Sequence, residues 1–248
     1  MITITEILDR SEQGMTRPFL CRADDGLLYY VKGRYAGQRS LCCEWVAGCL
    51  AQAVLDGLSI GVPVITMAEV PRALIEGSAR PDVRDLGAGL VFASLRVEAA
   101  QELSWSSSQG WPEEKMAALL LLDLWIQNED RSLSAQGGNP NLLVTPRRQP
   151  LWAYDFNLAF DDMFDRARFF DAHVFGGMVK QWPQGFREQM ESRLQVALER
   201  LPDLFAELPP EWLHLDGDDS LPVQLDERRV SSVLSLPFTD PAAFWKLP

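Results

Sequence analysis

The chain has 248 residues, of which 47% are apolar, so it can bury a sizeable core in one large domain or in two packed lobes. Its formal net charge of −12 argues against a nucleic-acid partner, which would need clustered Lys and Arg, and against binding to an anionic membrane surface. The longest apolar run, residues 116–122, is too short to span a bilayer, and the first eight residues alternate like a strand rather than forming an apolar targeting segment. We therefore expect a cytoplasmic protein with reduced cysteines.

The first third of the chain predicts strands around one helix. Strand patterns recur at residues 2–8, 19–22, 27–32, 62–70 and 90–95. The Asp25-Gly26 step is typical of a hairpin between the second and third of these segments. Helical spacing over residues 38–55 ends before Gly57, and glycine favours a helix stop.

The rest of the chain is predicted to be mostly helical. A central buried helix is expected to begin near Pro112, because proline suits the first turn, and to run through Trp125. Short strands are expected at residues 142–144 and 151–154 around a turn at 145–150, followed by helices over 188–201 and part of 226–234. We place a boundary within residues 87–94, which predicts an α+β fold with a β-rich lobe of residues 1–93 and a helical lobe of residues 94–248.

Two polar segments after the central helix contain the residue types that phosphoryl transfer needs. The first is Asn128-Glu-Asp-Arg131 followed by Asn139-Pro-Asn141, and the second is a strand that ends at Asp155. Kinases use one carboxylate beside the acceptor hydroxyl, and an Asn with a second carboxylate to hold Mg²⁺ against the phosphates. Because Asp155 lies between two aromatic residues in an apolar strand, where an unpartnered acid is costly to bury, its sequence context favours a ligand role.

The combined pattern resembles the HipA-like kinase family, a branch of the protein-kinase-like fold. The resemblance extends over about residues 1–200, judged from motif order. It rests on Trp125-Ile-x-Asn128-x-Asp-Arg131, Asn139-Pro-Asn-Leu-Leu143, Trp152-x-x-Asp155, and Tyr30-Val-Lys-Gly33 ahead of Glu44. It implies a two-lobed fold, ATP and Mg²⁺ as cofactors, and a Ser or Thr hydroxyl of a protein as the acceptor.

The resemblance also implies a role for each candidate residue. Lys32 would hold the α- and β-phosphates and pair with Glu44. Asp130 would orient or deprotonate the acceptor hydroxyl, while Asp155 would bind Mg²⁺ together with Asn141 or Asn139, of which we favour Asn141. The nucleotide contacts would come from the turn with Gly14 and Thr16, which would cover the phosphates, and from a hinge whose backbone would contact adenine, formed by Phe92, Ala93 and Ser94.

Two departures from the family pattern keep other functions open. The spacing from Asp130 to Asn139 is longer than in the usual kinase catalytic loop, and the phosphate-covering turn has one glycine, Gly14. Both features also fit a pseudokinase that binds nucleotide or a partner protein without catalysis. A small-molecule kinase is a third alternative, although such enzymes usually have His in the catalytic loop. The Asp130-Arg131 step could also be an ordinary ion pair, and the lone His173 is expected to be structural.

Overall fold

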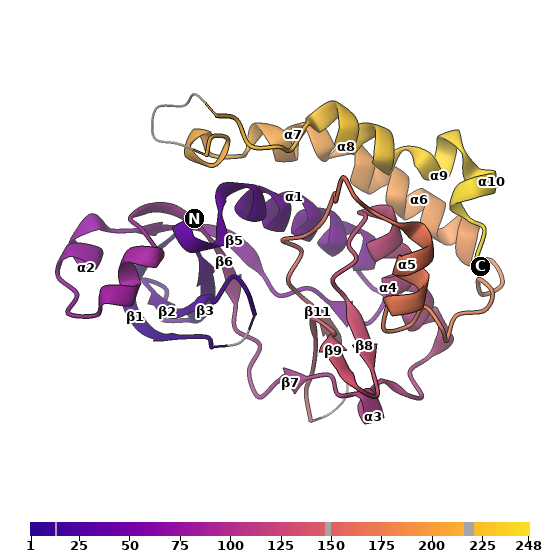
Figure 1. Ribbon diagram of the computed structural model, residues 1–248, viewed down its shortest axis with the longest axis horizontal. Coiled ribbons are helices and arrows are strands. Elements are labelled where there is room, and N and C mark those ends of the chain that lie inside the picture. The colour runs from indigo at the N-terminus through magenta and orange to yellow at the C-terminus, as the bar shows by residue number, and fades with distance from the viewer. Residues whose placement is uncertain (13, 147–149, 216–220) are drawn as a thin grey trace. The chain divides into compact units, whose positions relative to one another are not determined.

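The computed structural model describes residues 1–12, 14–146, 150–215 and 221–248 (Figure 1). The predicted turn at residues 145–150 includes residues 147–149, which lie outside this described part. The fold is α+β, as predicted. The chain divides into two compact units, each made of three segments. The first unit contains Met1–Trp45, Pro63–Val97 and Glu207–Gln224, and the second contains Val46–Val62, Glu98–Ala206 and Leu225–Pro248.

A closed five-stranded barrel forms the first unit. Its strand order is β1 (Ile2–Arg10), β2 (Phe19–Ala23), β3 (Leu28–Lys32), β6 (Gly89–Leu95) and β5 (Ile65–Val70). Neighbouring strands are antiparallel except for β1 and β5, which are parallel. Alternate side chains fill the interior, among them Phe19, Cys21 and Val31. The strands were predicted from their patterns, but closure was not, and it comes from a short pairing of β1 with β5 at Ile2 and Thr3.

The remaining elements of the first unit are short, apart from the shared helix α1 (Gln38–Leu55), which matches its predicted bounds. They are η1 (Arg34–Ala36), α2 (Arg72–Glu76), η2 (Pro81–Asp85) and η3 (Pro210–Trp212). The late segment Glu207–Gln224 belongs to this unit because Trp212 is buried in it. The Trp212 indole donates to the Leu90 carbonyl at 2.9 Å, and the Cys42 thiol donates to the Trp212 carbonyl at 3.4 Å.

The predicted division between residues 93 and 94 falls within β6. The first unit continues to Val97 and also includes the later segment that begins at Glu207. One boundary in the sequence therefore does not reproduce the two units. Whether the units correspond to the functional lobes that we expected stays a prediction.

The second unit combines small sheets with most of the helices. One sheet has the order β4 (Ile60–Gly61), β11 (Leu151–Ala153), β10 (Leu142–Val144) and β7 (Gln101–Glu102), and a separate hairpin pairs β8 (Ser132–Ser134) with β9 (Gly137–Asn139). The close approach of β4 to β11 explains a glycine at position 61, since a Cβ there would lie 2.4 Å from the Trp152 ring.

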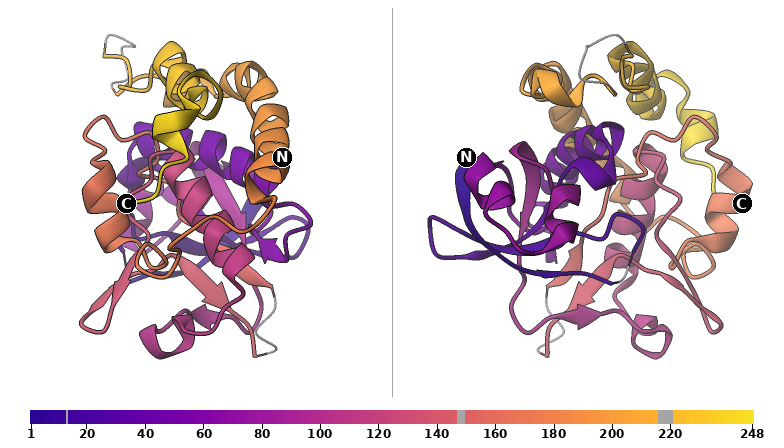
Figure 2. Two further views of the ribbon diagram at one scale, coloured as in Figure 1. Left: turned by 90° about the vertical axis from the view of Figure 1, so that its right-hand side faces the viewer. Right: turned by 60° about the vertical axis from the view of Figure 1, so that its left-hand side comes forward.

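Helix α4 (Glu113–Trp125) is the buried helix that the sequence predicts, with Ala117 through Trp125 all buried. The other helices of the second unit are α3 (Trp105–Ser108), α5 (Arg166–Ala172), α6 (Phe186–Glu199), α7 (Leu201–Ala206), α8 (Glu227–Leu234), α9 (Leu236–Thr239) and α10 (Pro241–Phe244). Helix α8, in the yellow part of the chain in Figure 2, contacts α7. In the part of the chain that the structure describes, no helix combines the length and apolarity needed to cross a membrane.

Candidate active site

A buried ion pair in the first unit joins two of the predicted residues. Lys32 ends β3, and Glu44 lies in the second turn of α1. Their side chains form a salt bridge although only 7% of Lys32 and 2% of Glu44 is exposed. Burying either charge alone would cost several kcal/mol, so each requires the other. The structure thus brings together the two residues expected to meet, with the ammonium held in place by a helix carboxylate.

In the second unit, both candidate asparagines donate hydrogen bonds to Asp130. Its Oδ2 atom accepts hydrogen bonds from the side-chain amides of Asn139 and Asn141, each at 2.8 Å. Asn139 is exposed at the end of β9, whereas Asn141 is buried just before β10 and has a φ of 46°. With the amide nitrogens directed at Asp130, the amide oxygens are the atoms that could bind a cation.

The β8–β9 hairpin accounts for the long spacing between Asp130 and Asn139. Ser132 pairs with Asn139 across the hairpin, so the chain returns to the point from which it left. Gly138 permits this return, because a Cβ there would lie 2.5 Å from the Ser132 carbonyl oxygen. The additional residues are therefore folded into a hairpin, and the side chains of Asp130 and Asn139 still meet.

Asp155 comes two residues after β11, at the end of the β10–β11 hairpin where Asn141 precedes β10. Leu142 is in register with Ala153, and the Tyr154 amide donates to the Asn141 carbonyl at 3.1 Å. Asp155 is thus the next residue after a hydrogen-bonded pair that includes Asn141. Its φ of 60° is in the left-handed region, which is uncommon for a residue other than glycine and is often found at functional sites.

A buried network that the sequence analysis missed centres on Asp123 of α4. Its carboxylate accepts from Arg131 Nε at 2.6 Å, from His173 Nε2 at 3.0 Å and from the Asn128 amide at 3.0 Å. Burial alone would raise the pKa of Asp123, but the charge of Arg131 and the His173 hydrogen bond outweigh it and lower that pKa. The available signal was a single acid in the otherwise apolar stretch 116–125.

His173 is held as the neutral imidazole within this network. Its Nδ1 accepts from the Phe175 amide at 3.1 Å, which leaves Nε2 to donate to Asp123. Burial lowers the pKa of His173, although the bond to Asp123 opposes the shift. The expectation that His173 has a structural role agrees with this position.

Arg131 links the network to the candidate site. Besides Asp123, its guanidinium donates to the carbonyls of Asn141, Pro140 and Tyr154, the latter two at 3.4 Å. These carbonyls lie together at the open end of the β10–β11 hairpin, where the candidate residues Asn141 and Asp155 are. The acid that pairs with Arg131 is therefore Asp123 and not its neighbour Asp130, and the guanidinium, which is fully buried, also holds the backbone just before β10 and just after β11.

The remaining predicted residues lie in the first unit. Gly14 and Thr16 are in the turn between β1 and β2, which the Ser11 amide closes by donating to the Pro18 carbonyl at 2.8 Å. The φ of 77° at Gly14 suits glycine, and a Cβ there would meet no atom within 4 Å. Conformation rather than space therefore favours glycine at this position.

The expected hinge is not supported by the sheet register. Phe92, Ala93 and Ser94 lie in β6 and have register partners in both β3 and β5. Their backbone groups face neighbouring strands, so an adenine contact through them would have to replace sheet hydrogen bonds. The sequence pattern located this strand correctly but did not reveal that it is central in the barrel.

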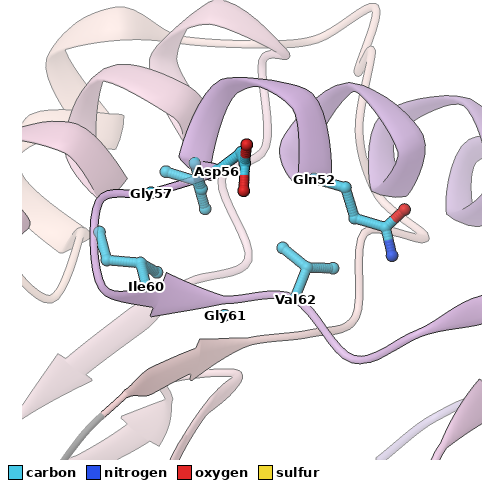
Figure 3. Close-up of a pocket in the computed structure, with 7 residues that line it drawn as sticks. Gln52, Asp56, Gly57, Ile60, Gly61 and Val62 are labelled. Carbon is cyan, nitrogen blue, oxygen red and sulfur yellow. The ribbon is translucent and has the colours of Figure 1, made fainter.

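A pocket of about 230 Å³ lies in the second unit beside the end of α1 (Figure 3). It is lined by Gln52, Leu55, Asp56, Gly57, Ile60, Gly61 and Val62. None of the predicted site residues lines it, and we assign it no role.

The donor set bears on which metal could bind. Within the described ranges, no group of three or more His, Cys, Asp or Glu side chains could hold a metal ion. The candidate set of Asp155 with an Asn amide oxygen fits Mg²⁺, which is usually held by one or two carboxylates together with phosphate oxygens and water. These residues therefore fit a metal that binds with a nucleotide rather than a metal in a protein-only cage.

Comparison with protein-family models matches residues 4–248 to the HipA-like kinase family. The chain belongs to this family, and the match extends beyond the roughly 200 residues covered by the motif resemblance. Membership supports a kinase-like phosphotransferase. No curated protein matches the sequence significantly.

Solved structures with a similar arrangement are distant. A crystal structure of the Golgi casein kinase with Mn/ADP bound is 13% identical, with 95% of this chain and 72% of that chain covered and a TM-score of 0.48. A second Golgi casein kinase structure is 13% identical, with 100% and 76% covered and a TM-score of 0.47. A MAP kinase from Leishmania major is 11% identical, with 99% and 80% covered and a TM-score of 0.30. At these scores we base no functional argument on them.

Proposed function

We propose that this protein is an ATP- and Mg²⁺-dependent phosphotransferase that transfers the γ-phosphate of ATP to a Ser or Thr hydroxyl of a protein. The observation that carries the proposal is the pair of hydrogen bonds from Asn139 and Asn141 to Asp130, next to the β10–β11 hairpin that Asp155 follows. Membership of the HipA-like kinase family supports the reaction class. The protein acceptor is implied by the family resemblance.

Asp130 acts on the acceptor hydroxyl in this proposal. The two amide donors on Oδ2 fix the orientation of the carboxylate, and Oδ1 receives the hydrogen bond of the hydroxyl. The hydroxyl oxygen attacks the γ-phosphorus as the bond to the β–γ bridging oxygen breaks, and ADP leaves. The hydroxyl proton passes to Asp130.

Phosphate and metal binding fall to other residues. Lys32 contacts the α- and β-phosphates, and Glu44 orients its ammonium group. Asp155 and the Asn141 amide oxygen hold Mg²⁺, which supplies neutralisation of phosphate charge when bound. Thr16 and the backbone of the Gly14 turn cover the phosphates. Arg131 keeps the β10–β11 hairpin ends in place, so that Asn141 and Asp155 are presented together.

Phosphate transfer from ATP to protein acceptors, measured with purified variants, tests this assignment. We expect Asp130→Ala and Asp155→Ala to lower the transfer rate by a factor of about 100 or more. Asp171→Ala removes an exposed carboxylate from α5 and should keep the wild-type rate. If both site variants fold and retain wild-type turnover, the assignment is wrong.

A pseudokinase is the alternative function that one observation favours, namely the single glycine in the Gly14 turn. The long Asp130–Asn139 spacing no longer supports it, because the β8–β9 hairpin returns Asn139 to Asp130. Calorimetry would distinguish the two functions, since nucleotide binding without transfer to any acceptor would identify a pseudokinase. A panel of small hydroxyl compounds, tested beside casein-type proteins, would identify a small-molecule kinase.

A further inference from the structure

Helix α8, near the C-terminus, places an arginine on the segment that follows Asp155. The Arg229 guanidinium donates to the carbonyls of Phe160 and Asp161, each at 3.0 Å. Its Nη2 atom also lies 3.5 Å from the Gln127 side-chain oxygen, and its Nε atom lies 2.8 Å from Asp162 Oδ1. One planar group thus contacts three consecutive residues of this segment and the start of the loop after α4.

The segment from Asp155 to Phe160 needs support at both ends. Asp155 and Phe160 have φ values of 60° and 59°, a region that costs on the order of 1 kcal/mol or more for residues other than glycine. At its start, the buried Phe156 ring lies against the Arg131 guanidinium, 5.4 Å from ring centroid to Cζ. At its end, the Phe160 amide donates to the Ile126 carbonyl at 2.8 Å, and the Phe160 carbonyl accepts from Arg229.

Helix α8 is itself fastened in the second unit. The Asp226 side chain caps its first turn by accepting from the Arg229 amide at 2.7 Å, and Val230 and Leu234 are fully buried. The Trp125 indole at the end of α4 donates to the Leu234 carbonyl at 2.8 Å. The helix that carries Arg229 is therefore tied to the helix that leads into Asp130.

We propose that Arg229 is a positioning residue for the Mg²⁺-binding Asp155, acting through the Phe160 and Asp161 carbonyls. This inference rests on the proposed function, because it assumes that Asp155 binds the metal. It assigns helix α8 to the phosphotransfer machinery, although residues after 201 contain none of the recognised motifs.

The rival explanation is an ordinary surface ion pair between Arg229 and Asp162, whose side chain is 56% exposed. Such pairs contribute about 0–1 kcal/mol and would not affect a metal site. The two explanations differ in which partner matters. Removing the Asp162 carboxylate tests the ion pair, whereas removing the guanidinium tests the carbonyl contacts as well.

The experiment measures the binding of a fluorescent ATP analogue while Mg²⁺ is titrated, in the full chain. We expect Arg229→Gln to raise the half-saturating Mg²⁺ concentration about tenfold, as loss of an outer-shell contact typically does. Arg228→Gln, an exposed neighbour on the same helix, and Asp162→Asn should both stay within about twofold of wild type. Arg229→Lys keeps the charge but loses the planar fork, so it should also require more Mg²⁺, and it serves if the Gln variant fails to fold.

An Arg229 variant with wild-type Mg²⁺ dependence would overturn the inference, and so would an Asp162→Asn variant that reproduces the effect of Arg229→Gln. A wild-type protein whose nucleotide binding ignores Mg²⁺ would overturn it as well. The assay does not depend on phosphate transfer. If the wild type binds Mg²⁺ and nucleotide but transfers no phosphate, the proposed function fails while the Arg229 comparison still decides the inference.

Discussion

Each unit contains a buried ion pair, and the two pairs differ in what they hold. In the first unit, Lys32 and Glu44 join a barrel strand to α1. In the second, Asp123 and Arg131 are fully buried and also contact His173, Asn128 and backbone carbonyls at the open end of the β10–β11 hairpin. The first pair orients one side chain, that of Lys32. The second pair holds in place the backbone on which the candidate residues lie.

The largest effect is expected from neutralising Asp123. Asp123→Asn leaves the Arg131 guanidinium buried without its counter-charge, which should lower the free energy of unfolding by about 3–5 kcal/mol. Urea denaturation measures this change. Asp171→Asn, an exposed acid in the same unit, should change the free energy of unfolding by no more than about 0.5 kcal/mol. A loss below about 1 kcal/mol for Asp123→Asn would show that the network does not support the fold as described.

Double-mutant cycles would sharpen the comparison between the pairs. Lys32→Met alone leaves Glu44 buried and should cost about 3 kcal/mol, while adding Glu44→Leu should recover much of that loss. The corresponding double variant Asp123→Leu with Arg131→Met should recover less, because the carbonyls of Asn141 and Tyr154 also lose a donor. Equal recovery in the two cycles would contradict the distinction that we draw.

The smallest effect is expected from the protonation of His173. Because burial lowers its folded-state pKa, the unfolded chain takes up a proton first as the pH falls below about 6.5. The free energy of unfolding should therefore decrease from there towards the folded pKa. For Asp123, whose folded pKa is lowered, stability is lost only at more acidic pH, below about 3.9.

Denaturation curves recorded between pH 8 and pH 5.5 measure the slope for His173. The wild type should lose stability across this range, and His173→Gln should lose less because the titrating group is gone. Identical slopes in the two proteins would show that His173 does not contribute.

Local patterns predicted much of the fold. The strands of the barrel, the bounds of α1 and the buried α4 follow from periodicity and turn residues that span a few positions. Barrel closure, and the return of Glu207–Gln224 to the first unit through Trp212, depend on contacts between distant segments, which periodicity does not encode.

In the candidate site, too, some residues could be predicted from local patterns, whereas others depend on contacts between distant segments. Asp130, Asn139, Asn141 and Asp155 occur within short motifs, so residue types and spacing point to them. Asp123 and His173 are 50 residues apart, and an acid in an apolar helix does not indicate its partner. Arg229 belongs to a helix without any motif, and its contacts with Phe160 and Asp161 are visible only in the folded chain.

The central claim is that Asp155 binds Mg²⁺ whereas Asp130 acts on the acceptor hydroxyl. It is tested most directly by measuring nucleotide binding with and without Mg²⁺, in the wild type and in Asp130→Ala and Asp155→Ala. We predict that Mg²⁺ strengthens binding of a non-hydrolysable ATP analogue to the wild type and to Asp130→Ala, but not to Asp155→Ala. Wild-type Mg²⁺ dependence in Asp155→Ala, or a wild-type protein that does not bind the analogue, would contradict the account.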